Sequence, residues 1–379
     1  MEIDVPELAI VAIIGDVQKD RIKFAQKHFK KEEIFNSTQE DRIEQRLKAG
    51  ELVAIHFDFA DKEAYKMVMK LGKKQHAQPI AILIYKQREE DEESLVERLE
   101  ENTKKKGFKQ VEVLTLKQLL SRIEIKRTKL SNNKREIKGP FDIIGDVHGC
   151  YDELCELLEK LGYEVDKMQH KVYPSQGRKV VFCGDLVDRG PKIVDVLKLV
   201  MGMVESEVAY AVIGNHDGKL QRKLNGANVQ VIHGLEVTLE QLGKESEAFR
   251  EKVRNFLGGL VSHYVFDEGK LVVAHAGLKE RLQGRESKRI RDLAMFGETT
   301  GKVDEFGLPI RLDWSAQYKG RALVVYGHTP KAEATMNNYT INIDTGCVYG
   351  GKLTAFRYPE QELVQVNAKA TYYESIRPI

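Results

Sequence analysis

Five short apolar runs recur across the last two-thirds of the chain, and a glycine or alanine follows each of them. The runs occupy residues 141–144, 180–183, 210–213, 271–273 and 323–326. Their β-branched and aromatic residues are continuous, which is typical of strands that are buried on both faces of a sheet. Between the first two runs, residues 151–161 carry apolar side chains at helical spacing. Strand, helix and strand in this order predict an α/β fold.

The first 138 residues carry a separate pattern. An apolar run from Val5 to Ile14 ends at Gly15 and is followed by an amphipathic stretch, which predicts a smaller α/β domain. A polar and basic stretch that ends at Gly139-Pro140 is typical of a linker. We therefore expect an N-terminal domain at residues 1–125, a basic linker at 126–139 and a C-terminal domain at 140–379. The length of 379 residues agrees with two domains.

A polar cluster follows each of the five apolar runs. The clusters read Gly145-Asp146-Val147-His148-Gly149, Gly184-Asp185-Leu186-Val187-Asp188-Arg189-Gly190, Gly214-Asn215-His216-Asp217, Ala274-His275-Ala276-Gly277 and Gly327-His328-Thr329. Ligands of α/β proteins bind beyond the carboxyl ends of the strands. The five loops that carry these clusters (the loop tips) can therefore converge on one site.

The residue types in these clusters favour a two-metal hydrolytic centre. Two divalent ions about 3.5–4 Å apart can share one carboxylate and hold a bridging hydroxide that is aimed at phosphorus. Asp185 is the expected bridge because it follows a strand directly. The other expected ligands are Asp146 and His148 for the first ion, and Asn215, His275 and His328 for the second. Oxygen and imidazole donors suit manganese, which we favour, with iron, zinc or nickel as alternatives.

The remaining polar residues of these clusters suit catalysis. Arg189 offers a planar fork for phosphate oxygens. His216 can contact the substrate and protonate the leaving oxygen, with Asp188 fixing its tautomer. Taken singly, each motif has a simpler interpretation: Asp-Xaa-His after a strand is more often a turn, and a lone His275 would be a core histidine. The occurrence of all five motifs together, each after a predicted strand, favours the metal site over these simpler interpretations.

The order GDVHG, GDLVDRG, GNHD and a late GH resembles the calcineurin-like metallophosphoesterases. Over about residues 139–379 the chain is similar to the phosphatase module of bacterial polynucleotide kinase-phosphatases. It is also similar to the PrpE-type bis(5′-nucleosyl)-tetraphosphatases, whose ending resembles Ile343-Asp344-Thr345-Gly346-Cys347 through Ile376-Arg377-Pro378-Ile379. The resemblance implies a four-layer α/β/β/α fold with two mixed sheets. It also implies the metal ligands above, phosphate contact by Arg189 and Asn215, an influence of His148 on the choice between monoester and diester, and a supporting role for Asp344.

The N-terminal domain resembles a degenerate form of the kinase domain of polynucleotide kinase-phosphatase. Counting on from Gly15, the second glycine, lysine and hydroxyl positions of G-x-x-x-x-G-K-[ST] hold Asp20, Arg21 and Ile22. Aspartate repels phosphate and isoleucine cannot hold magnesium. We therefore expect a degenerate P-loop kinase-like domain without kinase activity, and the alternative is an unrelated small α/β domain.

Arginines are frequent between residues 281 and 320, a segment that can roof the metal site. One interpretation is that one or more of them, with Arg285 and Arg291 as the residues to test, binds a second phosphate of the substrate. The other is an ion-pair network with Glu280, Glu286 and Asp292. His233 and His263 lie in none of the five clusters and are interpreted as structural.

The composition of the chain limits the classes of function and the locations that it can have. A net charge of +2 with 31% charged residues argues against a protein dedicated to coating nucleic acid. The four cysteines form no secreted disulfide pattern, no signal peptide is apparent and no apolar run approaches 18 residues. A cytoplasmic location without membrane association is expected.

These observations predict a dimetal-dependent phosphohydrolase. Its expected substrate is a nucleotide: a dinucleoside polyphosphate such as diadenosine tetraphosphate, or an RNA end with a 3′-phosphate or 2′,3′-cyclic phosphate. One alternative is a serine/threonine phosphoprotein phosphatase, because GDLVDRG also resembles the motif of that class. Another is a non-enzymatic adaptor whose degenerate N-terminal domain docks an unknown protein partner.

Overall fold

The computed structural model describes residues 1–85, 92–119, 121–174 and 177–377. The chain forms two compact units, the first made of Met1–Ser131 with Arg285–Ser287 and the second of Asn132–Gly284 with Lys288–Ile379. The change of unit at Ser131 thus falls inside the predicted linker. Pro378 and Ile379, the last residues of the family-like ending, lie outside the described residues.

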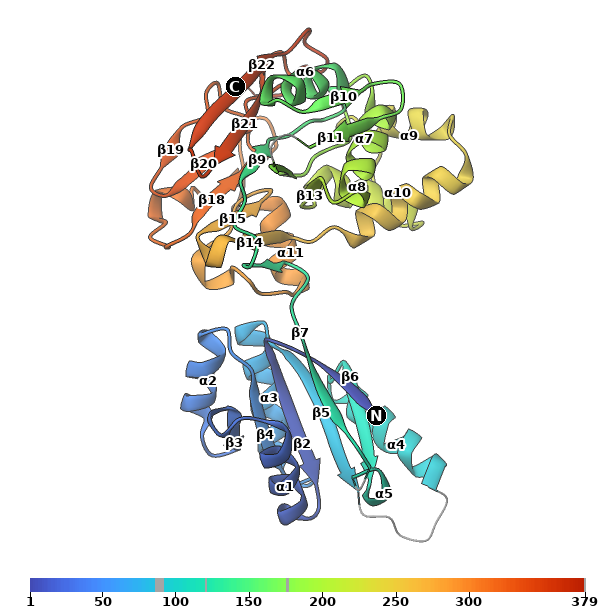
Figure 1. Ribbon diagram of the computed structural model, residues 1–379, viewed down its shortest axis with the longest axis vertical. Coiled ribbons are helices and arrows are strands. Elements are labelled where there is room, and N and C mark those ends of the chain that lie inside the picture. The colour runs from blue at the N-terminus through green and yellow to red at the C-terminus, as the bar shows by residue number, and fades with distance from the viewer. Residues whose placement is uncertain (86–91, 120, 175–176, 378–379) are drawn as a thin grey trace. The chain divides into compact units, whose positions relative to one another are not determined.

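The first unit contains a five-stranded sheet in which all neighbouring strands are parallel, in the order β3-β4-β2-β5-β6 (Figure 1). Its strands are β2 (Ala9–Gly15), β3 (Ile34–Asn36), β4 (Val53–Phe57), β5 (Gln78–Tyr85) and β6 (Gln110–Thr115). Its helices are α1 (Gln18–His28), α2 (Glu40–Lys48), α3 (Lys62–Gln75), α4 (Glu92–Lys105) and α5 (Leu116–Leu119). Every residue of β2 is buried, as expected for the central strand of a sheet covered on both faces.

A separate parallel pair joins the beginning and the end of the first unit. Strand β1 (Glu2–Pro6) pairs with β7 (Glu124–Thr128), so part of the predicted linker is a strand of this unit. A little further on, β8 (Asn133–Lys134) pairs with β14 in the second unit.

The second unit contains two mixed sheets. The order of the first is β13-β12-β9-β21-β22, and its strands are β9 (Phe141–Ile144), β12 (Lys179–Phe182), β13 (Ala209–Ala211), β21 (Lys352–Tyr358) and β22 (Glu362–Asn367). The order of the second is β19-β20-β18-β15-β14-β8, and its further strands are β14 (His263–Phe266), β15 (Leu271–Ala274), β18 (Leu323–Tyr326), β19 (Met336–Asn337) and β20 (Thr340–Asn342). Two small hairpins stand apart: β10 (Glu164–Asp166) with β11 (Lys171–Tyr173), and β16 (Thr299–Val303) with β17 (Pro309–Arg311).

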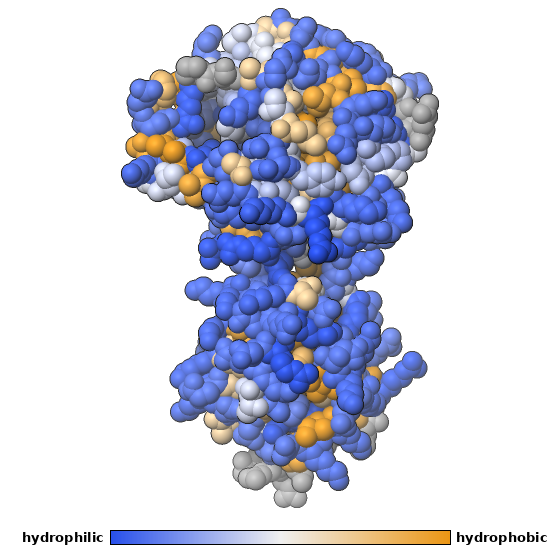
Figure 2. All heavy atoms as spheres, turned by 90° about the vertical axis from the view of Figure 1, so that its left-hand side faces the viewer, coloured by the Kyte–Doolittle hydropathy of each residue, from blue (hydrophilic) through white to orange (hydrophobic). Residues whose placement is uncertain are grey.

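The second unit has six α-helices within the described residues. They are α6 (Tyr151–Leu161), α7 (Ile193–Glu205), α8 (Asn215–Leu224), α9 (Leu235–Gly243), α10 (Glu247–Gly259) and α11 (Lys288–Phe296). Helices α6 and α7 pack on the first sheet, while Tyr318, Ala322 and Trp314 pack against Val265, Val272 and Val324 of the second. Between the two sheets, Phe141 and Val181 of one sheet pack with Phe266 and Val273 of the other in a single apolar core. The predicted α/β class and the two-sheet arrangement are therefore confirmed. The face drawn in Figure 2 is covered mainly by hydrophilic residues with scattered hydrophobic ones. In the described part of the chain, no helix is both long and apolar enough to span a bilayer.

Candidate metal centre

The five predicted loop tips come from strands whose carboxyl ends share an edge. In one sheet β9, β12 and β13 are parallel neighbours, and they lead into the loops with Asp146, Asp185 and Asn215. In the other sheet β15, β18 and β20 are also parallel, and they lead to His275, His328 and Asp344. Parallel pairing places the ends of neighbouring strands on the same side. The sheets therefore bring polar residues that are far apart in sequence to one place.

Asp185 is central to this cluster. One of its oxygens lies 3.4 Å from Nε2 of His275 and 3.6 Å from Nε2 of His148. Its other oxygen accepts a hydrogen bond of 2.9 Å from the backbone N–H of His216. Burial acts to raise the pKa of Asp185, but the neighbouring histidines outweigh it and hold that pKa well below its usual value. The neighbouring histidines thus favour the charged form of the Asp185 carboxylate.

Two groups of possible metal ligands share Asp185. One consists of Asp185 with His148 and His216, and the other of Asp185 with His275 and His328. Within each group the ligand atoms all lie within 4.8 Å of one another. The sharing of one carboxylate between two sets of donors is what a two-ion site requires.

The second group also contacts the predicted amide ligand. Nε2 of His275 lies 2.9 Å from Oδ1 of Asn215 and 2.9 Å from Nδ1 of His328. The ring of His275 is oriented by Nδ1, which lies 2.9 Å from the carbonyl oxygen of Cys183. Asp185 and Asp146 overcome the effect of burial and raise the pKa of His275 to about 9.

Asp146 and Asp344 extend the cluster on the side of His328. Both oxygens of Asp146 accept from the backbone N–H of His328, at 3.2 and 3.1 Å. Burial and the neighbouring Asp344 raise the pKa of Asp146 well above its usual value, and burial raises that of Asp344 to about 6. Asp146, predicted as a ligand of the first ion, thus lies in the cluster beside His328, and its role as a ligand stays a prediction.

The donors fit divalent cations in chemistry as well as in position. In the described part of the chain, Nε2 of His328 is buried without a hydrogen-bond partner, so it is available to a cation. His148 directs Nδ1 to the carbonyl oxygen of Val187 at 2.7 Å, which leaves its Nε2 facing Asp185. Imidazole nitrogens and carboxylate oxygens suit manganese, iron or zinc. A divalent cation would also offset the charges of carboxylates that otherwise raise one another's pKa.

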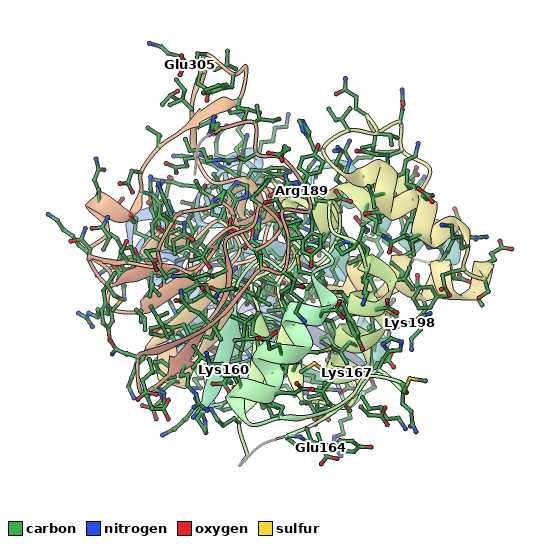
Figure 3. The ribbon with its side chains drawn as sticks, turned by 90° about the horizontal axis from the view of Figure 1, so that it is seen from above. Lys160, Glu164, Lys167, Arg189, Lys198 and Glu305 are labelled. Carbon is green, nitrogen blue, oxygen red and sulfur yellow. The ribbon has the colours of Figure 1, made fainter. Side chains whose placement is uncertain are left out.

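Arg189 and His216 form the polar group beside these donors (Figure 3 labels Arg189). The guanidinium donates to Nε2 of His148 and to Nε2 of His216, at 2.8 Å each. On the other side of His216, Nδ1 lies 2.6 Å from Oδ2 of the fully buried Asp188. The hydroxyl of Thr238 donates to the second oxygen of Asp188 at 2.6 Å. The predicted pairing of His216 with Asp188 is therefore present in the structure.

The backbone of the site is strained where it carries these groups. Five predicted site residues have positive φ: His148, Asp185, Asp188, Arg189 and His328. Such angles are uncommon outside glycine and concentrate at functional sites. Close approach explains two of the glycines in the motifs. A Cβ on Gly327 would lie 2.0 Å from Oδ1 of Asp146, and one on Gly190 would lie 1.8 Å from the carbonyl oxygen of His148.

Sequence reasoning missed some residues of the site. Thr238 contacts Asp188 across 50 positions of sequence. The rings of Tyr349 and Tyr373 flank Arg189, with centroids 5.3 and 5.7 Å from its guanidinium carbon. None of these residues lies in one of the five motifs. Tertiary packing brings them to the site: Thr238 from α9, and Tyr349 and Tyr373 from the C-terminal segment.

Two arginines predicted as candidates for binding a second phosphate are engaged elsewhere. Arg285 belongs to the first unit, is buried, and donates to the carbonyl oxygens of Leu47, Lys48 and Gln75. Arg291 donates to the carbonyl oxygen of Leu260 at 2.6 Å. The guanidinium of Arg285 thus satisfies carbonyl groups at the ends of α2 and α3. In the same segment, Arg311 lies near His328, whose pKa it helps to lower.

In the first unit, the cation that follows Gly15 is engaged internally. Arg21, at the lysine position of the P-loop pattern, is buried, donates to the carbonyl oxygen of Gly15 and lies 3.3 Å from Oδ2 of Asp58.

The chain is similar to several known phosphoesterases. The family model described as calcineurin-like phosphoesterase matches residues 139–332. The bis(5′-nucleosyl)-tetraphosphatase PrpE of Geobacillus sp. (strain WCH70) is 46% identical over 236 residues, which cover 61% of this chain and 96% of that protein. PrpE of Bacillus subtilis (strain 168) is 46% identical over 244 residues, covering 63% and 99%. A crystal structure described as a putative diadenosine tetraphosphatase has a TM-score of 0.47 and 25% identity, covering 62% of this chain and 96% of that one.

The family match spans all five motifs but not the Asp344 segment, and the donors that it covers are those gathered around Asp185. The chain therefore belongs to the calcineurin-like phosphoesterase family and is a hydrolase with a metallophosphoesterase domain.

Proposed function

We propose that the second unit hydrolyses a nucleotide substrate at a pair of divalent ions, and that this substrate is a dinucleoside polyphosphate. The observation that carries the proposal is the sharing of Asp185 by two groups of buried donors. When bound, the ions would activate water for attack on phosphorus and neutralise charge on the phosphate. Asp146, His148, Asp185, Asn215, His275 and His328 are the proposed ligands, and Asp344 would support them.

Arg189 is the proposed phosphate-binding residue. In this structure both of its donor nitrogens contact neutral imidazole nitrogens. Phosphate oxygens are stronger acceptors than these, because both partners are then charged. An entering phosphate would therefore bind the guanidinium in place of the two imidazoles, and the amide of Asn215 is the second proposed phosphate contact.

His216 is the proposed general acid. Once Arg189 has moved to the phosphate, Nε2 of His216 is free to carry a proton and to donate it to the leaving oxygen. Asp188, at 2.6 Å from Nδ1, holds the ring and stabilises its protonated form. The hydroxyl of Thr238 keeps the Asp188 carboxylate in place.

The choice of substrate is supported by the relatives. Two bis(5′-nucleosyl)-tetraphosphatases match over 96% and 99% of their length, so the second unit has a counterpart for nearly all of each. An RNA end with a 3′-phosphate or 2′,3′-cyclic phosphate is the second candidate within the nucleotide class. Manganese is the proposed metal on the basis of the mixed nitrogen and oxygen donors. A cytoplasmic location stays a prediction.

For the first unit we propose a P-loop-like domain that does not bind nucleotide phosphates. The engagement of Arg21 by Gly15 and Asp58 supports this, because the cation that a phosphate would need is already neutralised.

The experiment compares substrates at equal enzyme and metal concentrations. The full chain is loaded with Mn²⁺ and given diadenosine tetraphosphate, an RNA with a 3′-phosphate, an RNA with a 2′,3′-cyclic phosphate, and a phosphopeptide. We expect kcat/KM to be at least about tenfold higher for diadenosine tetraphosphate, a difference of about 1.4 kcal/mol in transition-state binding. A preference for either RNA would replace the proposed substrate, and a preference for the phosphopeptide would favour a protein phosphatase. Asp185→Asn is the control for contaminating activity.

A further inference from the structure

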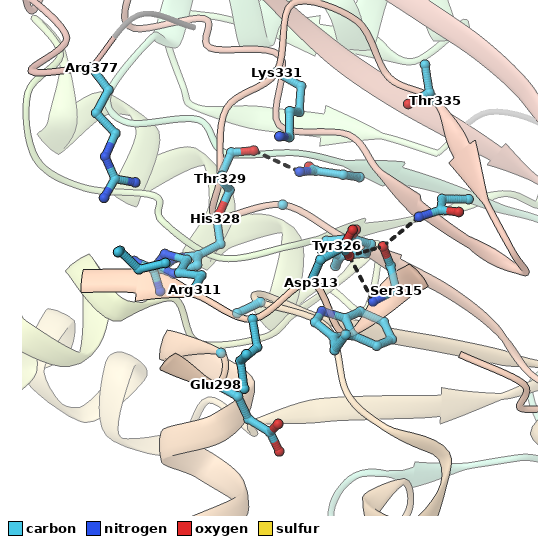
Figure 4. A pocket seen from close by; sticks show the side chains of 18 of the residues that line it. Glu298, Arg311, Asp313, Ser315, Tyr326, His328, Thr329, Lys331, Thr335 and Arg377 are labelled. Atoms are coloured by element: carbon cyan, nitrogen blue, oxygen red, sulfur yellow. Dashed lines mark hydrogen bonds between the residues drawn. The ribbon is translucent and has the colours of Figure 1, made fainter. Parts of the chain in front are cut away.

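A cavity of about 860 Å³ opens beside the metal centre in the second unit (Figure 4). His328, one of the proposed metal ligands, forms part of its wall. The segment from Gly297 to Ser315, which includes the β16–β17 hairpin, forms much of the opposite wall. Figure 3 shows this hairpin projecting, with Glu305 near its tip. Pockets for small molecules commonly have volumes of about 300–1,000 Å³, so the cavity is large enough for most of a nucleotide.

Basic and acidic side chains both line this cavity, and three of its four carboxylates pair with a cation. Three basic residues line it: Arg311, Lys331 and Arg377. Four carboxylates line it as well, but each has a partner. Glu298 pairs with Lys279 at 2.5 Å, Asp304 with Arg377 at 2.6 Å and Glu333 with Lys352 at 2.8 Å, while Asp313 accepts from the hydroxyl of Ser315 at 2.6 Å.

Arg311 and Lys331 thus form no ion pair with these carboxylates, although the positive charge of Lys331 adds to the hydrogen bond from Ser315 in lowering the pKa of Asp313. Within the residues that the structure describes, neither has a carboxylate oxygen within ion-pair distance, and Arg311 donates only to the carbonyl oxygen of Phe296. Burial and the neighbouring Arg377 lower the pKa of Arg311, so an anion between these guanidinium groups would be stabilised. The backbone N–H of Lys331 donates to the carbonyl oxygen of Asp344 at 3.0 Å. Lys331 is therefore anchored close to the metal centre while its side chain is exposed.

The same cavity has an apolar wall. Ile310 and Leu312, which are 38% and 46% exposed, lie in its lining with Trp314 and Tyr326. The ring of Trp314 is held in place, with its centroid 5.2 Å from that of Tyr326 and with Gly277 directly against its indole edge. A Cβ on Gly277 would lie 1.9 Å from the indole. Large apolar side chains exposed beside a rigid aromatic ring favour contact with a flat ligand such as a nucleobase.

We propose that this cavity binds the part of the nucleotide substrate that lies beyond the phosphate under attack. Its phosphates would contact Arg311 and Lys331, and its base would lie against Ile310, Leu312 and Trp314. The inference rests on the proposed function, because it assigns a place to the second half of a dinucleoside polyphosphate. It also assigns to Arg311 the role that the sequence suggested for the arginines of this segment.

Three substrates separate the two parts of the subsite. p-Nitrophenyl phosphate reaches only the metal centre, inorganic tetraphosphate adds the distal phosphates, and diadenosine tetraphosphate adds the base. Lys331→Ala is expected to lower kcat/KM for both tetraphosphates by about tenfold more than for the aryl phosphate, the effect of one lost charge-assisted contact. Lys331→Arg should restore most of the loss. Leu312→Ser is expected to reduce kcat/KM for diadenosine tetraphosphate by about threefold to tenfold more than for inorganic tetraphosphate.

Lys319→Ala is the matched control, because Lys319 is exposed and lies outside the cavity lining. Thermal melting of all variants checks that the fold is kept, since both substituted side chains are exposed. If Lys331→Ala reduces turnover of all three substrates by the same factor, or of none, the subsite is refuted while the proposed function stands. If the wild-type protein itself shows no preference for diadenosine tetraphosphate over the RNAs and the phosphopeptide, the proposed function fails first, and the inference fails with it.

Discussion

Oδ2 of Asp188 lies 2.6 Å from Nδ1 of His216, and both side chains are almost completely buried. The carboxylate therefore sets which ring nitrogen of His216 carries the permanent proton, and leaves Nε2 for chemistry. Glycines frame this pair: Gly190 follows Arg189, and Gly234 packs against the Arg189 backbone, where a Cβ would lie 2.4 Å from the nitrogen. The backbone around Arg189 and the Asp188–His216 pair are thus packed closely together.

Asp188→Asn should reduce kcat by about a hundredfold or more for a substrate with a poor leaving group, because the ring loses the anion that stabilises its protonated form. The loss should be smaller for p-nitrophenyl phosphate, whose leaving group needs little help from an acid. The measurement is kcat for a series of aryl phosphates with different leaving-group pKa values. Thr238→Val, which removes only the hydroxyl that supports Asp188, should show a weaker form of the same trend. An equal loss for every leaving group would contradict the acid role of His216.

Asp185→Asn should reduce kcat by about three orders of magnitude, because one carboxylate serves both groups of donors. The same change should lower the content of both metals, which elemental analysis of the purified protein measures. Asp292→Asn, at an exposed carboxylate, should change neither quantity. A variant that lost one ion and kept the other in full would show that Asp185 is a ligand and not a bridge.

Tyr349→Leu should raise KM by about threefold to tenfold with little change in kcat, because the ring that flanks Arg189 helps to hold the guanidinium for phosphate binding. Tyr349→Phe keeps the ring face and should behave as wild type. Burial raises the pKa of Tyr349 to about 12, so its hydroxyl stays neutral over the working range of pH. A large loss in Tyr349→Phe would transfer the role from the ring to the hydroxyl.

His263 should make the stability of the second unit depend on pH. Its Nε2 accepts from the backbone N–H of Gly284 at 2.9 Å and lies 3.3 Å from the Asn132 amide, and burial lowers its pKa to about 3. The folded pKa is below the unfolded value of about 6.5, so this contribution to stability is fully present above pH 6.5 and is lost as the pH falls toward 3. The expected slope is about 1.4 kcal/mol per pH unit over that window.

Urea unfolding at pH 7.5 and at pH 5 tests this dependence. His263→Gln should be less stable than wild type at pH 7.5, but its stability should fall less between the two pH values. His170→Gln, at a partly exposed histidine, should keep the wild-type difference. The interpretation of His263 as structural agrees with its hydrogen bonds, and a wild-type slope in His263→Gln would show that another group causes the dependence.

The polar clusters and the runs before them could be predicted because both are local. The strands predicted at 141–144 and 323–326 coincide with β9 and β18, and the helix predicted at 151–161 coincides with α6. Buried strands show as continuous apolar runs, and glycine closes them where the chain must turn tightly, as at Gly327 beside Asp146. Spacing along the sequence was enough to place Asp185 and its partners at neighbouring strand ends.

Other features depended on contacts between distant segments. The basic stretch at 126–139 showed no strand periodicity, yet it contributes to β7 and β8 because other strands offer edges for pairing there. Arg285 and Arg311 lie in one arginine-rich segment, and the sequence alone did not show that their surroundings differ. Their environments differ completely: one caps helix ends in the first unit, and the other lines a cavity beside His328.

The sequence by itself therefore determined the α/β class, the chemistry of the donors and their family, because each depends on residue types at short spacing. Only the tertiary structure decided that His216 stands beside His148 and Asp185, that two tyrosines hold Arg189, and that Arg311 and Lys331 face a cavity. The physical reason is that side chains are brought together by the pairing and packing of strands that are far apart in sequence. The residues next to a charged side chain in the sequence do not determine how deeply it is buried or which groups it contacts in space.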